Sequence, residues 1–341
     1  MTDKQWNTIN AIVKGKSTDT VPVGFIIDSP WLPNWYGIKI IDYFSSETLW
    51  YDANLKAAES FPGIIFIPGF WSEYGMCTEP SAFGAKCVFH EDEFPFAEKV
   101  ILHHEEIGRL RKPNVKTNGL LPFMLNRLIR KRKDIEAEGH KIRFSVSRGP
   151  LNIASFLMGT TEFLTLLMLE PELAHKLLRT ITDFLLDWHE LQRKSIDTID
   201  GLLILDDIVG FIGEDEFKEF ALPYLKELYD IPAGIRFFHN DADCRSSLKY
   251  YPEIGINLFN PGPQMSLHEL KSITGNRITI LGTIPPRDVL ARGTEEEVRK
   301  AVKALLAETA DHSRLILSCG GGMPPGVPTG NILAFLDASG K

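Results

Sequence analysis

Gly201-Leu-Leu-Ile-Leu-Asp206 is a short apolar run that ends in an acid, and Gly234-Ile-Arg-Phe-Phe-His239 is a second run of the same kind. Residues 214–229 lie between the two runs and carry apolar side chains at helical spacing. A helix between two short apolar strands predicts parallel pairing with a right-handed crossover. The strands read as apolar on both faces, as expected where helices cover a sheet.

The same alternation of strands and helices continues toward the C-terminal end. Further strands are predicted at residues 256–259, 277–281 and 314–318, and further helices at 244–251, 266–273, 294–312 and 331–338. Thr294 and Glu297 form the capping-box pattern that begins the 294–312 helix. Upstream, three more strands are predicted at residues 21–26, 63–67 and 142–146. The total of eight strands predicts an α/β fold of the (β/α)8 TIM barrel type.

Residues 31–139 hold too much chain for simple connections between strands. We interpret them as N-terminal insertions that cover the barrel mouth. The chain has 341 residues and a hydrophobic content of 44%, which is enough for one large core. We therefore expect a single domain over residues 1–341.

Composition narrows the range of partners. A formal net charge of −8 repels phosphate backbones, so we expect no nucleic-acid partner. One basic cluster departs from this acidic balance, and it is either a solvated helix face or a docking patch for an acidic partner. The cluster consists of Arg127, Arg130, Lys131, Arg132 and Lys133.

The chain contains neither an apolar stretch of the roughly 18 residues that span a bilayer nor an apolar signal core at its start. These features predict a cytoplasmic protein with no membrane partner. Four cysteines in a chain of this length do not form a disulfide framework. A special cysteine is therefore expected to act as a thiolate ligand or as a nucleophile.

Three residues with metal-binding side chains lie where predicted strands end. Asp206 and His239 end two successive strands, and Cys319 follows the last one. In a TIM barrel the working residues come from these strand ends, and all three residue types bind zinc. Asp206 is thus a candidate catalytic and substrate-binding residue, or a fourth metal ligand. In the pair Asp206-Asp207, one acid is expected to orient a ligand or substrate and the other to cap the next helix, and the alternative is that both serve only helix entry and solvation.

The segment that begins at His239 is dense in ligands. Asp241 lies two residues after His239, so the two side chains share one face of an extended segment. Asp243 and Cys244 are alternative ligands, although Cys244 also fits as a small apolar residue in a helix. The structural alternative for His239 is a hydrogen-bonded core residue.

Cys319 begins the glycine-rich stretch Cys319-Gly320-Gly321-Gly322-Met323. Glycines let the backbone approach a ligand closely, so Met323 is a candidate substrate-binding residue. A phosphate cradle is a second interpretation, but the stretch lacks the Lys-Ser/Thr ending of a P-loop and is followed by two prolines. A nucleophilic Cys319 is a third, without an identifiable base.

The segment Phe70-Trp71-Ser72-Glu73-Tyr74 is rich in aromatic side chains. Together with Glu79 it is either the lining of a pocket for a flat ligand or an ordered loop. Glu73 is the candidate substrate-binding residue of this segment.

The chain resembles the uroporphyrinogen decarboxylase superfamily over nearly its whole length. The resemblance is carried by Arg148-Gly149-Pro150-Leu151, by residues 154–159 and 217–228, by Gly282-Thr-Ile-Pro-Pro286 and by residues 319–328. It implies a (β/α)8 barrel. Porphyrin decarboxylases of the superfamily bind a polycarboxylate with arginines near the start of the chain. Here Val23-Gly-Phe-Ile-Ile-Asp-Ser-Pro-Trp31 has no arginine, and the charge of Asp28 repels a polyanion.

The other branch of the superfamily consists of cobamide-dependent methyltransferases. Those that methylate thiols hold zinc with a His-x-Cys pair and a distant Cys after the last strand. His239 and Cys319 match the first and third positions, and Asp241 occupies the second. The resemblance thus implies zinc held by His239, Asp241 and Cys319, with a corrinoid (cobamide) carried by a partner protein.

The exchange of Cys for Asp241 has a chemical consequence. A carboxylate oxygen is harder than a thiolate and donates less electron density, so zinc stays more Lewis acidic and prefers harder substrate atoms. This favours a small methoxylated aromatic compound whose methyl group passes to or from a corrinoid protein. The alternatives are a methylcobamide:thiol methyltransferase, a decarboxylase of this superfamily that uses Asp206, and a non-catalytic binding barrel. A homodimer is compatible with each of them.

Overall fold

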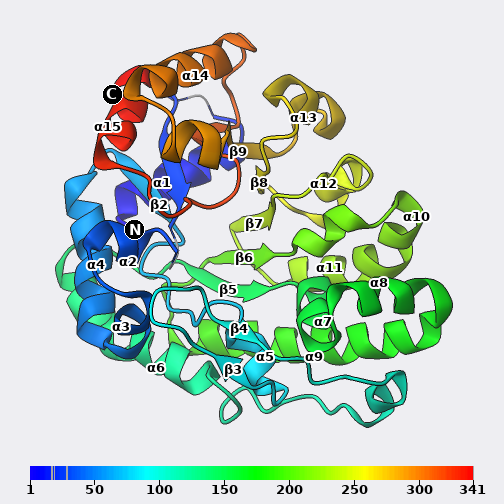
Figure 1. Ribbon diagram of the computed structural model, residues 1–341. Coiled ribbons are helices and arrows are strands. Elements are labelled where there is room, and N and C mark those ends of the chain that lie inside the picture. The colour runs from blue at the N-terminus through cyan, green and yellow to red at the C-terminus, as the bar shows by residue number, and fades with distance from the viewer. Residues whose placement is uncertain (17, 19, 28–29, 341) are drawn as a thin grey trace.

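Eight parallel strands form one curled sheet in the computed structural model, which describes residues 1–16, 18, 20–27 and 30–340 (Figure 1). The strands are β1 (Val23–Ile26), β2 (Ile64–Ile67), β5 (Phe144–Arg148), β6 (Gly201–Leu205), β7 (Ile235–Asn240), β8 (Leu258–Pro261), β9 (Thr279–Ile284) and β10 (Leu315–Cys319). Their order is β2-β1-β10-β9-β8-β7-β6-β5, so the first strand lies beside the last. All eight predicted strands, and with them the predicted TIM barrel class, are confirmed.

Side chains alternate between the two faces of each strand. In β6, Leu203 and Leu205 belong to the interior cluster of the barrel, whereas Leu202 and Ile204 belong to the outer cluster between strands and helices. The interior cluster joins β2 to β5, the two end strands of the sheet order, through Ile67 and other side chains. The barrel interior is therefore a packed core rather than a channel.

Helix α1 (Asp3–Val13) closes the amino-terminal end of the barrel. The Trp6 ring meets Phe144 of β5 edge-on at 5.4 Å between centroids, and the Thr279 hydroxyl donates to the carbonyl of Ile12 at 3.3 Å. Trp6 also belongs to the interior cluster. The opposite end, where the strands finish, is thus the end left for a functional site.

Helices cover the outer face of the sheet. After β5 come α7 (Pro150–Met158), α8 (Thr160–Leu169) and α9 (Pro171–Ser195), and after β6 come η2 (Asp207–Phe211), α10 (Glu214–Glu216), a π-helical turn η3 (Phe217–Ala221) and α11 (Leu222–Tyr229). The later connections hold η4 (Leu248–Tyr250), α12 (Tyr251–Ile254), α13 (Leu267–Thr274), η5 (Pro286–Ala291), α14 (Glu295–Ala307) and α15 (Thr329–Ala338). The capping box of Thr294 and Glu297 is present.

Two predicted helices are shorter than expected. The 294–312 helix ends at Ala307, and side-chain turns at Thr309 and Asp311 occupy the rest of that range. The predicted 244–251 helix does not begin until Leu248, because the Asp243 carboxylate accepts the Arg245 amide in a local turn at 3.1 Å.

The N-terminal insertions consist of short elements around β2. They are α2 (Leu32–Tyr36), α3 (Ile40–Ser45), α4 (Glu47–Ser60), α5 (Thr78–Ala82), the hairpin β3 (Cys87–Val88) and β4 (Phe96–Ala97), η1 (His104–Arg109) and α6 (Leu121–Ala137). The segment after β2 reaches the carboxyl end of β5, because Glu79 accepts the amide of Arg148 at 3.2 Å. This part of the insertions therefore lies at the barrel mouth.

No single helix in the described part of the chain is long and apolar enough to cross a membrane. Helices α7 and α8 reach that length only together, and they meet at an angle of 110°.

Candidate metal centre

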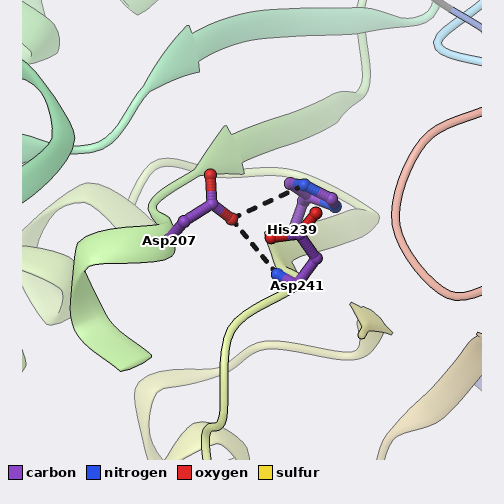
Figure 2. Close-up of side chains that lie close together, drawn as sticks. All are labelled: Asp207, His239 and Asp241. Atoms are coloured by element: carbon purple, nitrogen blue, oxygen red, sulfur yellow. Dashed lines mark hydrogen bonds and ion pairs between the residues drawn. The ribbon is translucent and has the colours of Figure 1, made fainter. Parts of the chain in front are cut away.

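Asp207, His239 and Asp241 lie together above the interior of the barrel (Figure 2). Each offers one ligand atom, and these atoms all lie within 4.8 Å of one another. The alternation of the strands brings them there: Leu205 faces the interior in β6 and Phe237 in β7, so Asp207 and His239, two residues later, continue the same faces. Asp241 follows His239 by another two residues, as predicted.

His239 is held in one orientation by its neighbour on β8. Its Nδ1 lies 2.8 Å from the side-chain oxygen of Asn260, and the Asn260 amide nitrogen donates to the carbonyls of Leu281 and Cys319 at 2.6 and 3.2 Å. Because both donors of Asn260 are used, its oxygen must accept from His239. Nδ1 therefore donates to Asn260, and Nε2 is the ring nitrogen that faces Asp207, 3.6 Å from its Oδ1.

Among the described residues, no lysine or arginine forms an ion pair with the two carboxylates of this cluster. Within the described residues, neither Asp207 nor Asp241 has a Lys or Arg nitrogen within 4.0 Å. Desolvation at the barrel mouth raises the pKa of Asp241; His239 and Arg287 oppose this rise, and Asp207 adds to it. Two carboxylates beside an imidazole form a set of hard oxygen and nitrogen donors that suits a divalent cation such as zinc.

Asp206 has a different environment from its neighbour Asp207. It is fully buried, and its two carboxylate oxygens accept the backbone amides of Leu151 and Asn152 at 2.9 Å each. It thus caps the amino-terminal turn of α7, and burial raises its pKa well above the usual value. Of the predicted pair, Asp207 joins the cluster, whereas Asp206 caps α7, which precedes it in the chain, and not the next helix as predicted. A catalytic or substrate-binding role for Asp206 stays a prediction, and this geometry does not favour it.

Cys319 is not part of the cluster that the structure shows. Ile316 of β10 faces the interior, so Cys319, three residues later, falls on the opposite face and belongs to the outer hydrophobic cluster. Its Sγ lies 3.5 Å from the carbonyl of Gly321. Asp207 takes the place that the sequence analysis gave to Cys319, whose metal role stays a prediction.

The alternative ligands Asp243 and Cys244 also lie elsewhere. Asp243 forms an ion pair with Arg245 at 2.6 Å on the surface. Cys244 is buried against Met265, and burial raises the pKa of its thiol to about 12. Both residues are therefore explained by local structure, and Asp241 is the acid of this segment that meets His239.

A buried polar group lies at the end of β5, beside the cluster-bearing β6. Arg148 and Glu73 form a buried ion pair at 3.0 Å, and the Arg148 guanidinium lies 5.5 Å from the Trp71 ring. Glu79 is 2% exposed, and one of its oxygens has no hydrogen-bond partner. Burial raises the pKa of Glu79, while Arg148 opposes the rise. The substrate-binding role of Glu73 stays a prediction.

Met323 is 1% exposed, and its amide donates to the carbonyl of Ile26 at 3.3 Å. The glycine-rich loop after β10 therefore folds back onto β1. Gly321 of this loop approaches Asp241 closely, since a Cβ atom there would lie 3.2 Å from an Asp241 oxygen. The predicted contact of Met323 with a substrate remains a prediction.

Sequence reasoning missed Asp207 and Asn260 as members of the site. Leu205 of β6 faces the interior, so counting two residues further predicts that Asp207 does too. Counting two residues from Leu258 of β8 predicts the same for Asn260. The strands were predicted correctly, but the prediction of site residues did not consider which face of its strand each end residue lies on.

Comparisons with known proteins agree with this fold. The chain matches the family model for uroporphyrinogen decarboxylase (URO-D) over residues 7–341. The uroporphyrinogen decarboxylase of Psychromonas ingrahamii is 22% identical over 278 residues, which cover 77% of this chain and 75% of that protein. A methyltransferase from Methanosarcina mazei superposes with a TM-score of 0.83 at 17% identity, with 98% of each chain covered.

A B12-independent methionine synthase from Shewanella sp. W3-18-1, solved in complex with selenomethionine, superposes less closely. Its TM-score is 0.59 at 13% identity, with 94% of this chain and 96% of that chain covered. At such identities the structural matches show a shared fold.

We predict that Asn260→Ala lowers the affinity of the site for zinc by about ten- to a hundredfold, because His239 loses the acceptor that fixes its tautomer. Competition with a chromogenic chelator measures this affinity. Asn257→Ala is the control: Asn257 bonds the backbone at the other end of β8, so its loss should affect stability alone. Equal zinc affinity in the two variants would show that Asn260 does not position a ligand.

We also predict that Glu79→Gln gains stability relative to the wild type as the pH rises from about 4 to about 7. The pKa of Glu79 is raised in the folded protein, so its contribution to stability is present below the unfolded pKa and is lost as pH rises through the folded pKa. Urea unfolding at several pH values measures the difference. Glu93→Gln, at an exposed acid, should show no such trend, and a flat difference for Glu79→Gln would contradict the prediction.

Proposed function

Because the chain belongs to the uroporphyrinogen decarboxylase family, we propose that it is a zinc-dependent methyltransferase which moves a methyl group between a small methoxylated aromatic compound and a corrinoid protein. The observation that carries the proposal is the cluster of Asp207, His239 and Asp241 at the barrel mouth. Its hard donors, its fixed imidazole and its two carboxylates support a bound divalent cation.

The charges at the mouth argue against a polycarboxylate substrate. Asp207 and Asp241 are both acidic, and the nearby Arg148 is already paired with Glu73 inside the protein. A porphyrinogen with many carboxylates would meet repulsion here and no unpaired arginine from β5. Asp28, whose charge supported the same conclusion from the sequence, lies outside the described residues.

The chain's own residues supply binding and orientation. Asp207, His239 and Asp241 would hold the cation, Asn260 orients His239 so that Nε2 faces the cluster, and Asp206 anchors α7 beside the cluster-bearing strand. When bound, zinc supplies Lewis acidity that stabilises negative charge on the oxygen of an aryl methyl ether.

The proposed reaction is a displacement at the methyl carbon. The bond from the ether oxygen to the methyl carbon breaks, and the oxygen keeps the electron pair as a phenolate, which then takes a proton from solvent. The methyl carbon is accepted by the reduced cobalt of the partner's corrinoid, which provides the electron pair of the new bond. A phenolate with a conjugate-acid pKa near ~10 is a poor leaving group, so cation assistance suits an ether more than a thioether.

Metal analysis tests the cluster. We predict that Asp207→Ala, His239→Ala and Asp241→Ala each lose most of the bound zinc, because each removes one of three donors. Asp243→Ala is the matched control, since this nearby acid pairs with Arg245 instead. Cys319→Ala should keep its zinc if the structure shows the whole ligand set. Full zinc content in Asp207→Ala, or its loss in Cys319→Ala alone, would overturn the assignment.

Anaerobic incubation of the zinc-loaded protein with cob(I)alamin and methoxylated aromatics tests the reaction. We expect the absorption spectrum of methyl-Co(III) to appear only when zinc is bound, and not with His239→Ala. Methyl-thiol substrates reacting in place of ethers would favour the thiol branch. Release of carbon dioxide from a porphyrinogen without metal would favour the decarboxylase activity that gives the family its name.

A further inference from the structure

The basic cluster of α6 divides into two parts in the structure. Lys131 pairs with Asp134 at 3.0 Å and Arg132 with Glu136 at 2.7 Å, so these two charges are balanced on the helix surface. Arg127 and Arg130 lie three residues, or about one turn, apart on the same helix. Within the described residues neither has a carboxylate within 4.0 Å, so two positive charges remain unbalanced.

These two arginines line a groove between α6 and the start of α4. The groove has a volume of about 480 Å³, within the range of small-molecule sites. Its walls include Phe44, Glu47, Tyr74, Phe123, Arg127 and Arg130. Phe123, Arg127 and Arg130 follow one another at helical spacing of three and four residues, so α6 presents them along one side.

Arg127 is the buried charge of the groove. It is 5% exposed; its Nη2 donates to the carbonyl of Phe44 and to the Tyr74 hydroxyl, the latter at 3.1 Å, and its Nη1 has no hydrogen-bond partner. The guanidinium carbon lies 4.9 Å from the Tyr74 ring and 5.5 Å from the Trp50 ring. Aromatic faces offset only part of the cost of burying a cation, so Arg127 favours an anion nearby.

We propose that this groove binds a small aromatic monocarboxylate. Two guanidinium groups face one carboxylate, that of Glu47 in the first turn of α4, which leaves one net positive charge and matches a monoanion. Phe123 is 64% exposed at the groove and offers its ring to a flat apolar ligand. The exposed Arg130 supplies the donors for the ligand's carboxylate, and the guanidinium of Arg127, whose Nη1 is buried, adds its positive charge to the groove wall.

This site is separate from the metal centre. Its residues come from α3, α4, α6 and Tyr74, and none of them belongs to the cluster of Asp207, His239 and Asp241. Binding at the groove therefore needs no metal, and it can be tested independently of the proposed methyl transfer.

Calorimetric titration of the metal-free protein with benzoate tests the proposal. We expect saturable binding that is about fivefold weaker in Arg130→Gln, because one charge-assisted contact at an exposed position is lost. Lys133→Gln is the matched control: it removes one positive charge from an exposed neighbour on the same helix that does not line the groove. Its affinity for benzoate should stay within about twofold of wild type.

Two further titrations separate the ring from the charge. Benzyl alcohol, which keeps the ring but lacks the anion, should bind at least about fivefold more weakly than benzoate. Phe123→Ala should weaken benzoate but leave the weak binding of acetate unchanged. Absence of saturable benzoate binding to the wild type, or equal affinities in Arg130→Gln and Lys133→Gln, would overturn the proposal.

Discussion

Side chains alternate across a β-strand, and this period of two decides which residues meet at the mouth of the barrel. Leu205 and Phe237 face inward, so Asp207 and His239 do the same, and Asp206 faces outward to cap α7. A shift of one residue in β6 would exchange Asp207 for the helix cap Asp206, and a shift of one residue in β7 would turn His239 away from the cluster. The chemistry of the site therefore depends on strand register before it depends on any single side chain.

Electrostatics explains why the three inward residues suit a cation. Asp207 and Asp241 repel each other, and His239 turns Nε2 toward the carboxylates because its Nδ1 donates to Asn260. A divalent cation is the natural partner for two carboxylates and one imidazole nitrogen. By contrast, the Glu73–Arg148 pair near the same mouth balances its own charges and needs no ligand to do so.

The eight strands could be predicted because each is a short apolar run bounded by polar or turn residues, and the helices between them follow the spacing of their apolar positions. Helix α1 was not predicted, although Thr2 and Gln5 form a capping box and Trp6, Ile9 and Val13 recur at helical spacing. Its role in closing the barrel end depends on tertiary contacts. His239 and Asp241 were found from their spacing. Cys319 was chosen because it follows the last strand, and the family pattern strengthened the choice, but neither says on which face of β10 the residue falls. Asp207 was missed as a ligand because the face of each residue after β6 was not counted either.

We propose that the metal centre is built from oxygen and nitrogen donors only. Zinc K-edge X-ray absorption of the zinc-loaded protein tests it most directly, because sulfur and oxygen or nitrogen ligands differ in distance and scattering. We expect the zinc ion to be surrounded by oxygen and nitrogen atoms alone, at about 2.0–2.2 Å, from Asp207, His239, Asp241 and solvent. A sulfur scatterer at about 2.3 Å would contradict it and would return Cys319 to the ligand set.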